Sequence, residues 1–396
     1  MAVKETSTTG WICLPDHPSP AAEVLKDLPG VFAPVPSSPY KGLRAFERAD
    51  RDLFFGRARV VRELAGAVAA RALVPLVGAS GVGKSSVVHA GLLPRLEDEA
   101  GWGFVTLRPR PTLLMALAAG LAQLSGAAVP VPGAQLEEWR ERLSQRGLAY
   151  AAELACGSSG KERVLLVVDQ FEEVLAQDCD LLLGQLAGLT DDGILTAVLT
   201  LREDSFGAFF VRHASFGERL RHSAIALRGM DRGELDEAVR NPAALRDVQI
   251  ADPLVDELAG AVLGRPWALP LLEFSLDQMW RTLRPGDRRL SFDAYEEIGR
   301  LDGALATHAD GVVASMSEAD RAVVRKVFVN YLTSPAEPGV RQMLLRSGCA
   351  PGDWQIIVRL ANERLLTIRR DDDGNETAEV VHEALLRAWG VSSAAG

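Results

Sequence analysis

The sequence predicts an α/β protein, with helices on both faces of a parallel sheet, followed by an all-helical domain and a winged-helix domain. Continuous apolar runs, typical of strands buried on both faces, alternate with helical patterns as far as residue 229. Beyond that residue the helical patterns continue without strands until an Asp-Gly turn near the C-terminus, which indicates a β-hairpin.

The predicted sheet region follows a proline-rich segment, residues 1–38, which we interpret as a linker because proline fixes φ and removes a hydrogen-bond donor. Apolar runs predict the strands, and apolar residues at helical spacing predict the helices. The strands are expected at 72–77, 104–107, 164–169, 194–202 and 224–227. The helices are expected at 59–71, near Lys84, and at 111–125, 134–156 and 171–188.

The second half of the chain shows helical periodicity and then the hairpin. Helices are expected at 232–241, 252–264, 268–283, 292–299 and 302–315, then at 318–332 and 353–362. The hairpin strands are expected at 365–370 and 377–383, around the turn 371–375. We therefore predict an α/β domain at 39–229, a helical domain at 230–316, a winged-helix domain at 317–390 and a tail at 391–396.

Composition restricts the classes of function. The 396 residues are 47% hydrophobic and 24% charged, which suits two or three domains with large cores. The net charge of −10 argues against broad nucleic-acid binding, because an acidic surface repels phosphate backbones. The cysteines are not spaced as zinc ligands or as a disulfide framework. Without an apolar run long enough for a bilayer or a signal-peptide pattern, we expect a cytoplasmic protein with no membrane partner.

The strongest motif is GASGVGKS at residues 78–85, a GxxxxGK[ST] match between a predicted strand and a predicted helix. Backbone N–H groups of such a loop close around phosphates at the positive end of the helix. Lys84 is expected to reach the β- and γ-phosphates, and Ser85 to ligate Mg²⁺. The predicted nucleotide-binding residues are Gly78, Gly81, Val82, Gly83, Lys84, Ser85 and Ser86. The motif therefore predicts ATP or ADP with Mg²⁺ as cofactors.

A second motif, VLLVVD at residues 164–169, is an apolar strand that ends in an acid. A parallel strand places Asp169 at the C-terminal edge of the sheet, beside the phosphates. We expect Asp169 to hold Mg²⁺ through water. Apolar runs that end in aspartate are common, but this one follows a phosphate-binding loop within an α/β pattern, which makes it specific.

Hydrolysis also needs a group that orients water. Gln170 follows Asp169, so the candidate bases are Glu172 and Glu173, with a slight preference for Glu172. Both acids could instead favour the N-terminus of a helix. Arg202 ends the next buried strand at the same sheet edge, where it could sense the γ-phosphate or pair with the acids that follow it.

Six stretches extend beyond these generic motifs. They are PYKGLRAFERADRDLFFGR (39–57), LVGASGVGKSSVVHAGLLPRL (76–96), VLLVVDQFEEVL (164–175), VLTLREDSF (198–206), ALPLLEFSLDQMW (268–280) and VVHEALLRAW (380–389). With these stretches the chain resembles the STAND-class P-loop NTPases, specifically the bacterial novel STAND group, relatives of the NACHT and NB-ARC switch ATPases. The similarity covers residues 39–389 in the order that the family shows.

The resemblance implies further roles. The segment before the P-loop that lines the adenine in the family is matched by Phe55, Gly56 and Arg57. Pro270 matches the helical-domain proline that packs on the base, and Arg202 matches the arginine sensor. His382 matches the winged-helix histidine that contacts the β-phosphate in the ADP-bound state. From the residue pattern alone, a single histidine is more often structural than a ligand.

The resemblance also implies a two-state clamp that is closed with ADP and opens with ATP. Related proteins then form homo-oligomers and activate an effector, in bacterial signalling or defence. Because Gln170 stands where many relatives carry glutamate, we expect slow hydrolysis. Few residues flank the matching region, so effector and sensor are expected from partner proteins, or from a longer chain, unless the protein acts as a lone regulator.

Other functions stay open at this point. A winged helix could read nucleic acid, but the helix at 354–363 offers one arginine, Arg359, and the expected wing tip at 371–373 carries three aspartates. An AAA+-like ATPase would turn over ATP steadily without retaining nucleotide. A scaffold would bind nucleotide and never change state.

Overall fold

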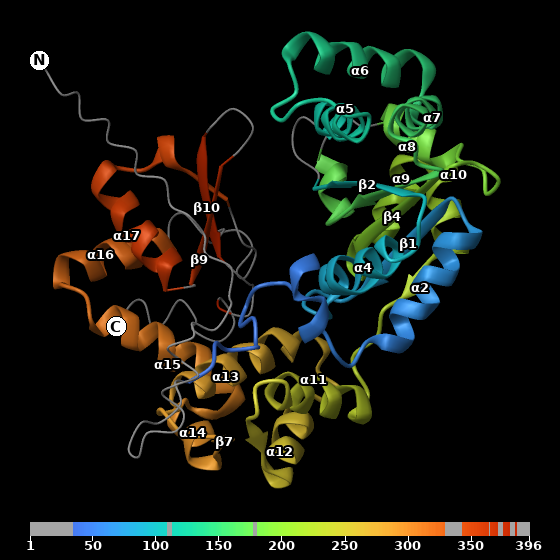
Figure 1. Ribbon diagram of the computed structural model, residues 1–396. Helices are drawn as coiled ribbons and strands as arrows, with labels where there is room; N and C mark the ends of the chain where they lie inside the picture. The colour runs from blue at the N-terminus through green and yellow to red at the C-terminus, as the bar shows by residue number, and fades with distance from the viewer. Residues whose placement is uncertain are drawn as a thin grey trace, which may run out of the picture.

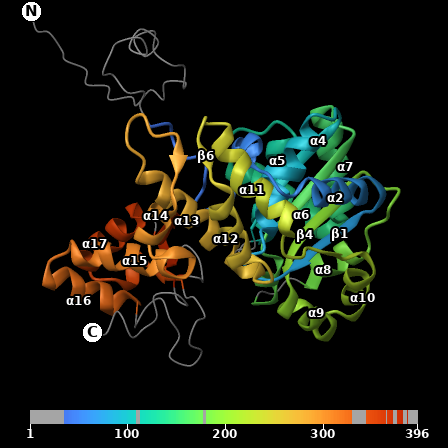
Figure 2. The same ribbon diagram turned by 90° about the horizontal axis from the view of Figure 1, so that it is seen from below.

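The structure, a computed structural model, describes residues 35–108, 113–176, 180–328, 343–363, 365–370 and 375–380, together with residue 385. Figure 1 shows a sheet region with its helices, a helical group that follows it in the chain, and a C-terminal group. The helical group lies between the other two, and it does so again in the view turned by 90° (Figure 2).

Five parallel strands form the central sheet in the order β2-β3-β4-β1-β5. The strands are β1 (Leu73–Gly78), β2 (Trp102–Leu107), β3 (Arg163–Val168), β4 (Leu195–Arg202) and β5 (Ile225–Ala226). Each lies within a few residues of a predicted strand, so the predicted α/β fold class is confirmed. Because the strands are parallel, their C-terminal ends meet at one edge of the sheet.

Helices cover both faces of this sheet. One face carries α5 (Leu113–Leu124), α6 (Gly133–Arg146), α7 (Leu148–Ser159), α8 (Asp180–Ala187), α9 (Phe206–Arg212) and α10 (Ala214–Ser223). The other carries α2 (Ala58–Ala70), α3 (Lys84–Ser86), the π-helical η3 (Val87–Leu92) and α4 (Leu93–Glu97). Side chains alternate along a strand, so Val164 and Leu166 of β3 join the first core and Leu165 joins the second.

Two predictions about these helices were wrong, and one pair of helices was not predicted. The helix expected at 134–156 is two helices, because Gly147 between α6 and α7 has φ of 88°, which an α-helix cannot accommodate. The helix expected at 171–188 is a short 3₁₀ helix, η4 (Phe171–Ala176), followed by α8. Helices α9 and α10 occupy a stretch for which no element is predicted.

The helical group contains five α-helices, as expected, but it is not purely helical. The helices are α11 (Arg232–Ala244), α12 (Asp252–Val262), α13 (Leu269–Arg281), α14 (Phe292–Glu297) and α15 (Arg300–Ala314), with a 3₁₀ helix, η6 (Pro266–Ala268), before α13. Strands β6 (Gln249–Ile250) and β7 (Arg289–Leu290) pair in parallel, which corrects the predicted absence of strands. Two residues are too few to produce a recognisable strand pattern.

The C-terminal group combines helices α16 (Glu318–Lys326) and α17 (Pro351–Asn362) with a 3₁₀ helix, η8 (Arg346–Gly348), and an antiparallel sheet of order β8-β10-β9. Strands β9 (Leu366–Arg370) and β10 (Glu376–Val380) pair as the predicted hairpin, and β8 (Leu344–Leu345) is an additional strand. Phe274 of α13 and Ile357 of α17 belong to one buried apolar core. The helical and C-terminal groups are therefore packed together.

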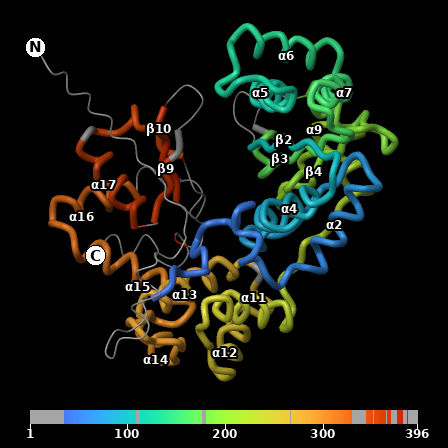
Figure 3. The backbone as a smooth tube through the Cα atoms, in the orientation of Figure 1, coloured from blue at the N-terminus to red at the C-terminus, as the bar shows by residue number. Residues whose placement is uncertain are grey.

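Residues 35–46, here called the strap, connect the helical group to the sheet region (Figure 3). The Trp280 indole N–H donates to the Pro36 carbonyl oxygen at 2.8 Å, and the Tyr40 hydroxyl donates to the Val239 carbonyl oxygen at 2.6 Å. At its other end, the Phe46 N–H donates to Ser86 Oγ at 3.1 Å. The strap thus contacts α13, α11 and the helix that follows β1.

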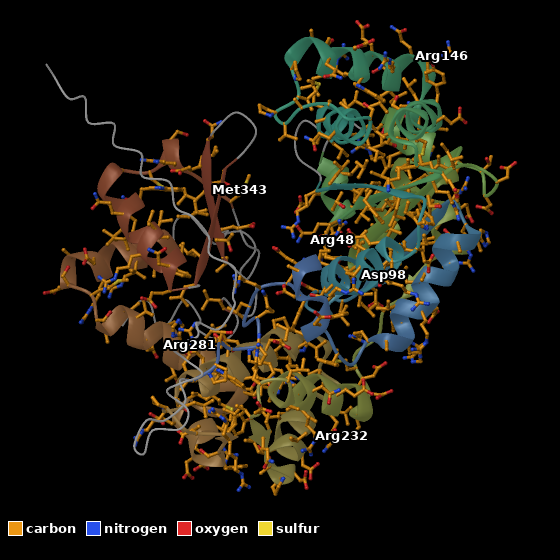
Figure 4. All side chains as sticks on the ribbon, viewed as in Figure 1. Arg48, Asp98, Arg146, Arg232, Arg281 and Met343 are labelled. Carbon is orange, nitrogen blue, oxygen red and sulfur yellow. The ribbon has the colours of Figure 1, made fainter. Side chains whose placement is uncertain are left out.

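The 3₁₀ helix η2 (Arg48–Leu53) follows the strap and is fixed to α4 by ion pairs. Arg48 Nη1 lies 2.6 Å from Glu97 Oε1, and Arg51 Nη2 lies 2.7 Å from Asp98 Oδ2. Arg48 and Asp98 are labelled in Figure 4. Within the described part of the chain, no helix combines the length and the apolar character needed to cross a bilayer.

Candidate nucleotide-binding site

The phosphate-binding loop lies between β1 and α3, and its glycines are needed for different reasons. Gly81 and Gly83 have φ of 80° and 95°, in the left-handed region that L side chains rarely adopt. A Cβ on Gly78 would lie 2.6 Å from the Leu227 carbonyl oxygen, whereas a Cβ on Gly83 would have no neighbour within 4 Å. Packing against the end of β5 therefore fixes Gly78, while the loop is open at Gly83.

The Lys84 side chain folds back onto this loop and is hydrogen-bonded to it. Its Nζ donates to the carbonyl oxygens of Gly78 and Ala79 at 2.7 and 2.9 Å. Burial lowers the pKa of the Lys84 ammonium group, and the nearby Glu172 carboxylate acts in the opposite direction. The ammonium group is thus held at the loop by the carbonyls of the loop itself.

Asp169 lies directly after β3 and is 1% exposed. Its Oδ1 accepts hydrogen bonds from Ser85 Oγ at 2.8 Å and from Thr200 Oγ1 at 2.7 Å. Its Oδ2 is buried and accepts no hydrogen bond. Arg108 Nη2 and His89 Nε2 lie 3.3 and 4.0 Å from that oxygen. The predicted pair of Ser85 and Asp169 is therefore together, with three further side chains around it.

Ser85 and Asp169 fit a Mg²⁺ site. A hydroxyl and a carboxylate, the oxygen ligands that Mg²⁺ prefers, adjoin each other at the sheet edge. Asp169 Oδ2 also has lone pairs that no protein hydrogen bond uses. Mg²⁺ in NTPases is generally held by one or two protein oxygens together with phosphates and water. These two residues would hold it in that way, and the ion would neutralise phosphate charge.

Glu172 is placed at the ends of β3 and β4. Its carboxylate is half-buried, and Oε2 accepts the Arg202 N–H at 3.3 Å. Burial raises the pKa of Glu172 above its ordinary value. Glu173, by contrast, is exposed. Gln170 has φ of 61° and donates its N–H to Thr200 Oγ1 at 2.8 Å. The geometry therefore favours Glu172 over Glu173 as the acid at the sheet edge.

The Arg202 side chain pairs with one of the acids that follow it, which was one of the two possibilities that the sequence left open. Its Nη2 lies 2.6 Å from Asp204 Oδ2, and its Nε donates to Asp204 Oδ1 at 3.1 Å. This hydrogen bonding lowers the pKa of Asp204. Arg202 is at the predicted sheet edge, and its role as a γ-phosphate sensor stays a prediction.

The segment before α2 joins the loop to the helical group. Arg57 is 2% exposed, and its guanidinium donates to the Val82 carbonyl oxygen at 2.8 Å and to the Arg228 carbonyl oxygen at 3.0 Å. Its Nη1 also lies 3.7 Å from Glu234 Oε2 in α11. A Cβ on Gly56, whose φ is 78°, would lie 2.3 Å from the Glu234 carbonyl oxygen. Both residues therefore pack tightly between the sheet region and α11.

For the remaining predicted residues, the structure shows fewer contacts with the phosphate-binding loop. Ser86 accepts the hydrogen bond of the strap. Phe55 is half-buried, and Pro270 is half-buried in the first turn of α13. His382 lies outside the described residues. Adenine contact by Phe55 or Pro270 and phosphate contact by His382 stay predictions.

Three residues around Asp169 were not predicted, namely His89, Arg108 and Thr200. Arg108 carried a usable signal, because a polar residue directly after an apolar strand also identified Asp169 and Arg202. Thr200 and His89 lie inside elements and carry no such signal.

Comparison with solved structures finds proteins that align over most of this chain at low sequence identity. The ORC1 protein of Aeropyrum pernix, solved in complex with DNA, is 17% identical, with 87% of this chain and 92% of that chain covered and a TM-score of 0.45. A Walker-type ATPase of Pyrococcus abyssi is 14% identical, with 88% and 98% covered and a TM-score of 0.45. A RuvB variant of Thermotoga maritima is 17% identical, with 85% and 97% covered and a TM-score of 0.40.

No curated protein matches the chain. The model of the family described as novel STAND NTPase 1 matches residues 39–392, a range that contains the phosphate-binding loop, Asp169 and all the elements described above. This match confirms the resemblance inferred from the sequence motifs. The chain belongs to the novel STAND NTPase 1 family and is a P-loop NTPase.

Proposed function

We propose that this protein is an ATP/ADP-binding molecular switch with slow ATP hydrolysis, of the kind used in STAND signalling or defence. The observation that carries the proposal is the arrangement of Lys84, Ser85 and Asp169 at one sheet edge, next to a buried arginine, Arg57, that reaches the helical group. A ligand on this loop would therefore be coupled to the position of that group.

Each residue of the sheet edge has a proposed role. Lys84 binds the β- and γ-phosphates, and Ser85 and Asp169 hold Mg²⁺. Glu172 orients the attacking water, supported by its position next to the Arg202 N–H. Gln170 cannot accept a proton as a carboxylate would, which favours slow hydrolysis. Arg202 would leave Asp204 to sense the γ-phosphate.

The proposed domains are the nucleotide-binding domain at 39–229, the helical domain at 230–316 and the winged-helix domain at 317–390. The shared core of the helical and C-terminal groups favours their movement as one body. In the ADP state His382 would contact the β-phosphate and keep the molecule closed. Exchange for ATP would open it, permit homo-oligomer formation and activate an effector that a partner supplies.

Released nucleotide tests the proposal directly. Freshly purified protein is denatured, and the nucleotide that it releases is identified by chromatography. About one equivalent of ADP is expected, because a closed switch retains its product. Small-angle scattering should then differ between ADP and a non-hydrolysable ATP analogue. Steady ATP turnover with no retained nucleotide would favour an AAA+-like ATPase, and identical scattering would favour a scaffold.

The proposed role of His382 in keeping the ADP-bound protein closed is tested by His382→Ala. ADP should bind about tenfold more weakly, because a charge-assisted contact to phosphate contributes about 1.5 kcal/mol or more. ATP affinity should change less, since the open state does not use this contact. Equal ADP affinity in the two proteins would make His382 a structural residue.

A further inference from the structure

Arg108 occupies an unusual position for a residue outside the known motifs. It directly follows β2, an edge strand of the sheet, which pairs with β3. Its Nη2 lies 3.3 Å from Asp169 Oδ2, the buried oxygen that accepts no hydrogen bond. His89 Nε2, the other nitrogen near this oxygen, is at 4.0 Å.

A buried carboxylate needs compensation for its lost hydration. Ser85 and Thr200 supply hydrogen bonds, but only to Oδ1 of Asp169. The charge on the Oδ2 side is therefore compensated by the Arg108 guanidinium. The same side of Asp169 is the one with lone pairs free for Mg²⁺ or for its bound water.

A divalent ion and a guanidinium compete for one carboxylate oxygen, because each repels the other at short range. The Arg108 side chain is 34% exposed, whereas Asp169 is 1% exposed, so the arginine can turn toward solvent and the aspartate cannot. When the two cations compete, Arg108 is the group that moves.

We propose that Arg108 is a place-holder cation for Mg²⁺, and this rests on the proposed nucleotide site. Arg108 neutralises Asp169 when the metal is absent and releases it when Mg²⁺ arrives with the nucleotide. Arg108 is thus a positioning residue that acts through Asp169. It determines how strongly nucleotide affinity depends on Mg²⁺.

The test is Arg108→Gln, which keeps polar donors and removes the charge. The dissociation constant of fluorescent ADP is measured in Mg²⁺ and in EDTA. The ratio of the constant in EDTA to the constant in Mg²⁺ is then compared with the wild-type ratio. In EDTA the variant should bind ADP about tenfold more weakly, because an uncompensated Asp169 repels the phosphates. In Mg²⁺ its affinity should equal or exceed that of the wild type, and half-saturation should need less Mg²⁺. The ratio of the constants should therefore rise about tenfold.

Two variants control for charge and for fold. Arg108→Lys keeps the charge and should keep the ratio within about twofold of the wild type. Arg140→Gln removes a half-exposed arginine that pairs with Glu137 on α6, and both constants should stay unchanged. Thermal unfolding without nucleotide checks that each variant folds.

An unchanged ratio would overturn the proposal. If ADP binding weakens equally in Mg²⁺ and in EDTA, Arg108 is instead a residue that binds phosphate directly. If Arg108→Gln does not fold, the lysine variant decides, because a ratio far from the wild-type value despite the retained charge contradicts a place-holder. A wild-type protein that binds no ADP would reject the nucleotide site itself. Wild-type binding with a ratio that Arg108→Gln does not alter would reject only the role of Arg108.

Discussion

The two sides of the candidate site are built on different principles. On the phosphate side, Lys84 and Asp169 follow different strands, β1 and β3, and their contacts are to a few loop carbonyls, hydroxyls and one half-exposed arginine. On the other side, here called the base side because the resemblance implies adenine contact there, Gly56 and Arg57 are buried between the sheet region and α11. A ligand can compete for the groups on the phosphate side. The groups on the base side are buried in the contact between the sheet region and the helical group.

This contrast predicts that changes on the phosphate side weaken binding, while changes on the base side weaken the fold. Four comparisons of variants, ordered from the largest expected effect to the smallest, either break the contrast or sharpen it.

Arg57→Ala should lower the free energy of unfolding by about 3–5 kcal/mol, because it leaves two carbonyl oxygens and Glu234 without their buried partner. Urea unfolding measures the loss. Arg59→Ala is a matched control, since Arg59 pairs with the same Glu234 at 3.4 Å but is 66% exposed. The control should lose less than about 1 kcal/mol. Similar losses in the two variants would show that burial of Arg57 does not stabilise this junction.

Lys84→Ala should weaken ATP binding at least 100-fold, about 2.7 kcal/mol, because it removes the main cation for the phosphates. Isothermal titration measures the affinity. The free energy of unfolding should change by less than about 1 kcal/mol, since Lys84 bonds only loop carbonyls that water can reach once the side chain is gone. A folded variant with wild-type affinity would contradict the assignment of the loop.

Two glycines with positive φ separate packing from binding. Gly56→Ala should destabilise the fold by about 2 kcal/mol, because the new Cβ would collide with the Glu234 carbonyl oxygen at 2.3 Å. Gly83→Ala has no such neighbour and should lose about 1 kcal/mol from its left-handed backbone alone. Its effect should instead be on nucleotide affinity. Equal unfolding midpoints for the two variants would remove the distinction between the two sides.

The smallest effect concerns Glu273 on α13, whose Oε2 accepts the Lys41 N–H of the strap at 3.1 Å. Burial, followed by the charge of Asp277, raises the pKa of Glu273 to about 8. The folded protein therefore keeps this proton to higher pH than the unfolded chain, whose ordinary glutamate pKa is about 4.3. This contribution to stability is fully present below that value, and it is lost as pH rises toward about 8.

Glu273→Gln should remove this decline, so the variant should gain about 1 kcal/mol or more on the wild type between pH 5 and pH 8. Urea unfolding at several pH values measures the slope. Glu237→Gln on α11 changes an exposed glutamate and should leave the slope as it is. Parallel wild-type and Glu273→Gln curves would show that Glu273 titrates normally.

The phosphate side was largely predictable because its signals are local. A buried parallel strand is a continuous apolar run, and the residue after such a run lies at the sheet edge, so Asp169 and Arg202 could be placed from the sequence. The partners of Asp169 could not. Arg108 reaches it because β2 lies beside β3, and Thr200 because β4 lies on the other side. Strand order is set by packing of the whole domain, which no short pattern encodes.

The base side depends on long-range contacts even more strongly. The resemblance placed residues 55–57 near the nucleotide, but it could not show that the Arg57 side chain is used for the Val82 carbonyl and α11. The short β6–β7 pair brings together residues 40 positions apart, Gln249 and Arg289, and is invisible for the same reason.

The strap carries a mechanical consequence. It is anchored on the helical group through Pro36 and Tyr40, and on the first turn after the P-loop through Phe46. A force applied at Val35 would therefore act on both the helical group and the helix that follows the P-loop, because the strap connects them. A module fused directly before Val35 would be joined to the helix that follows the P-loop through the strap alone.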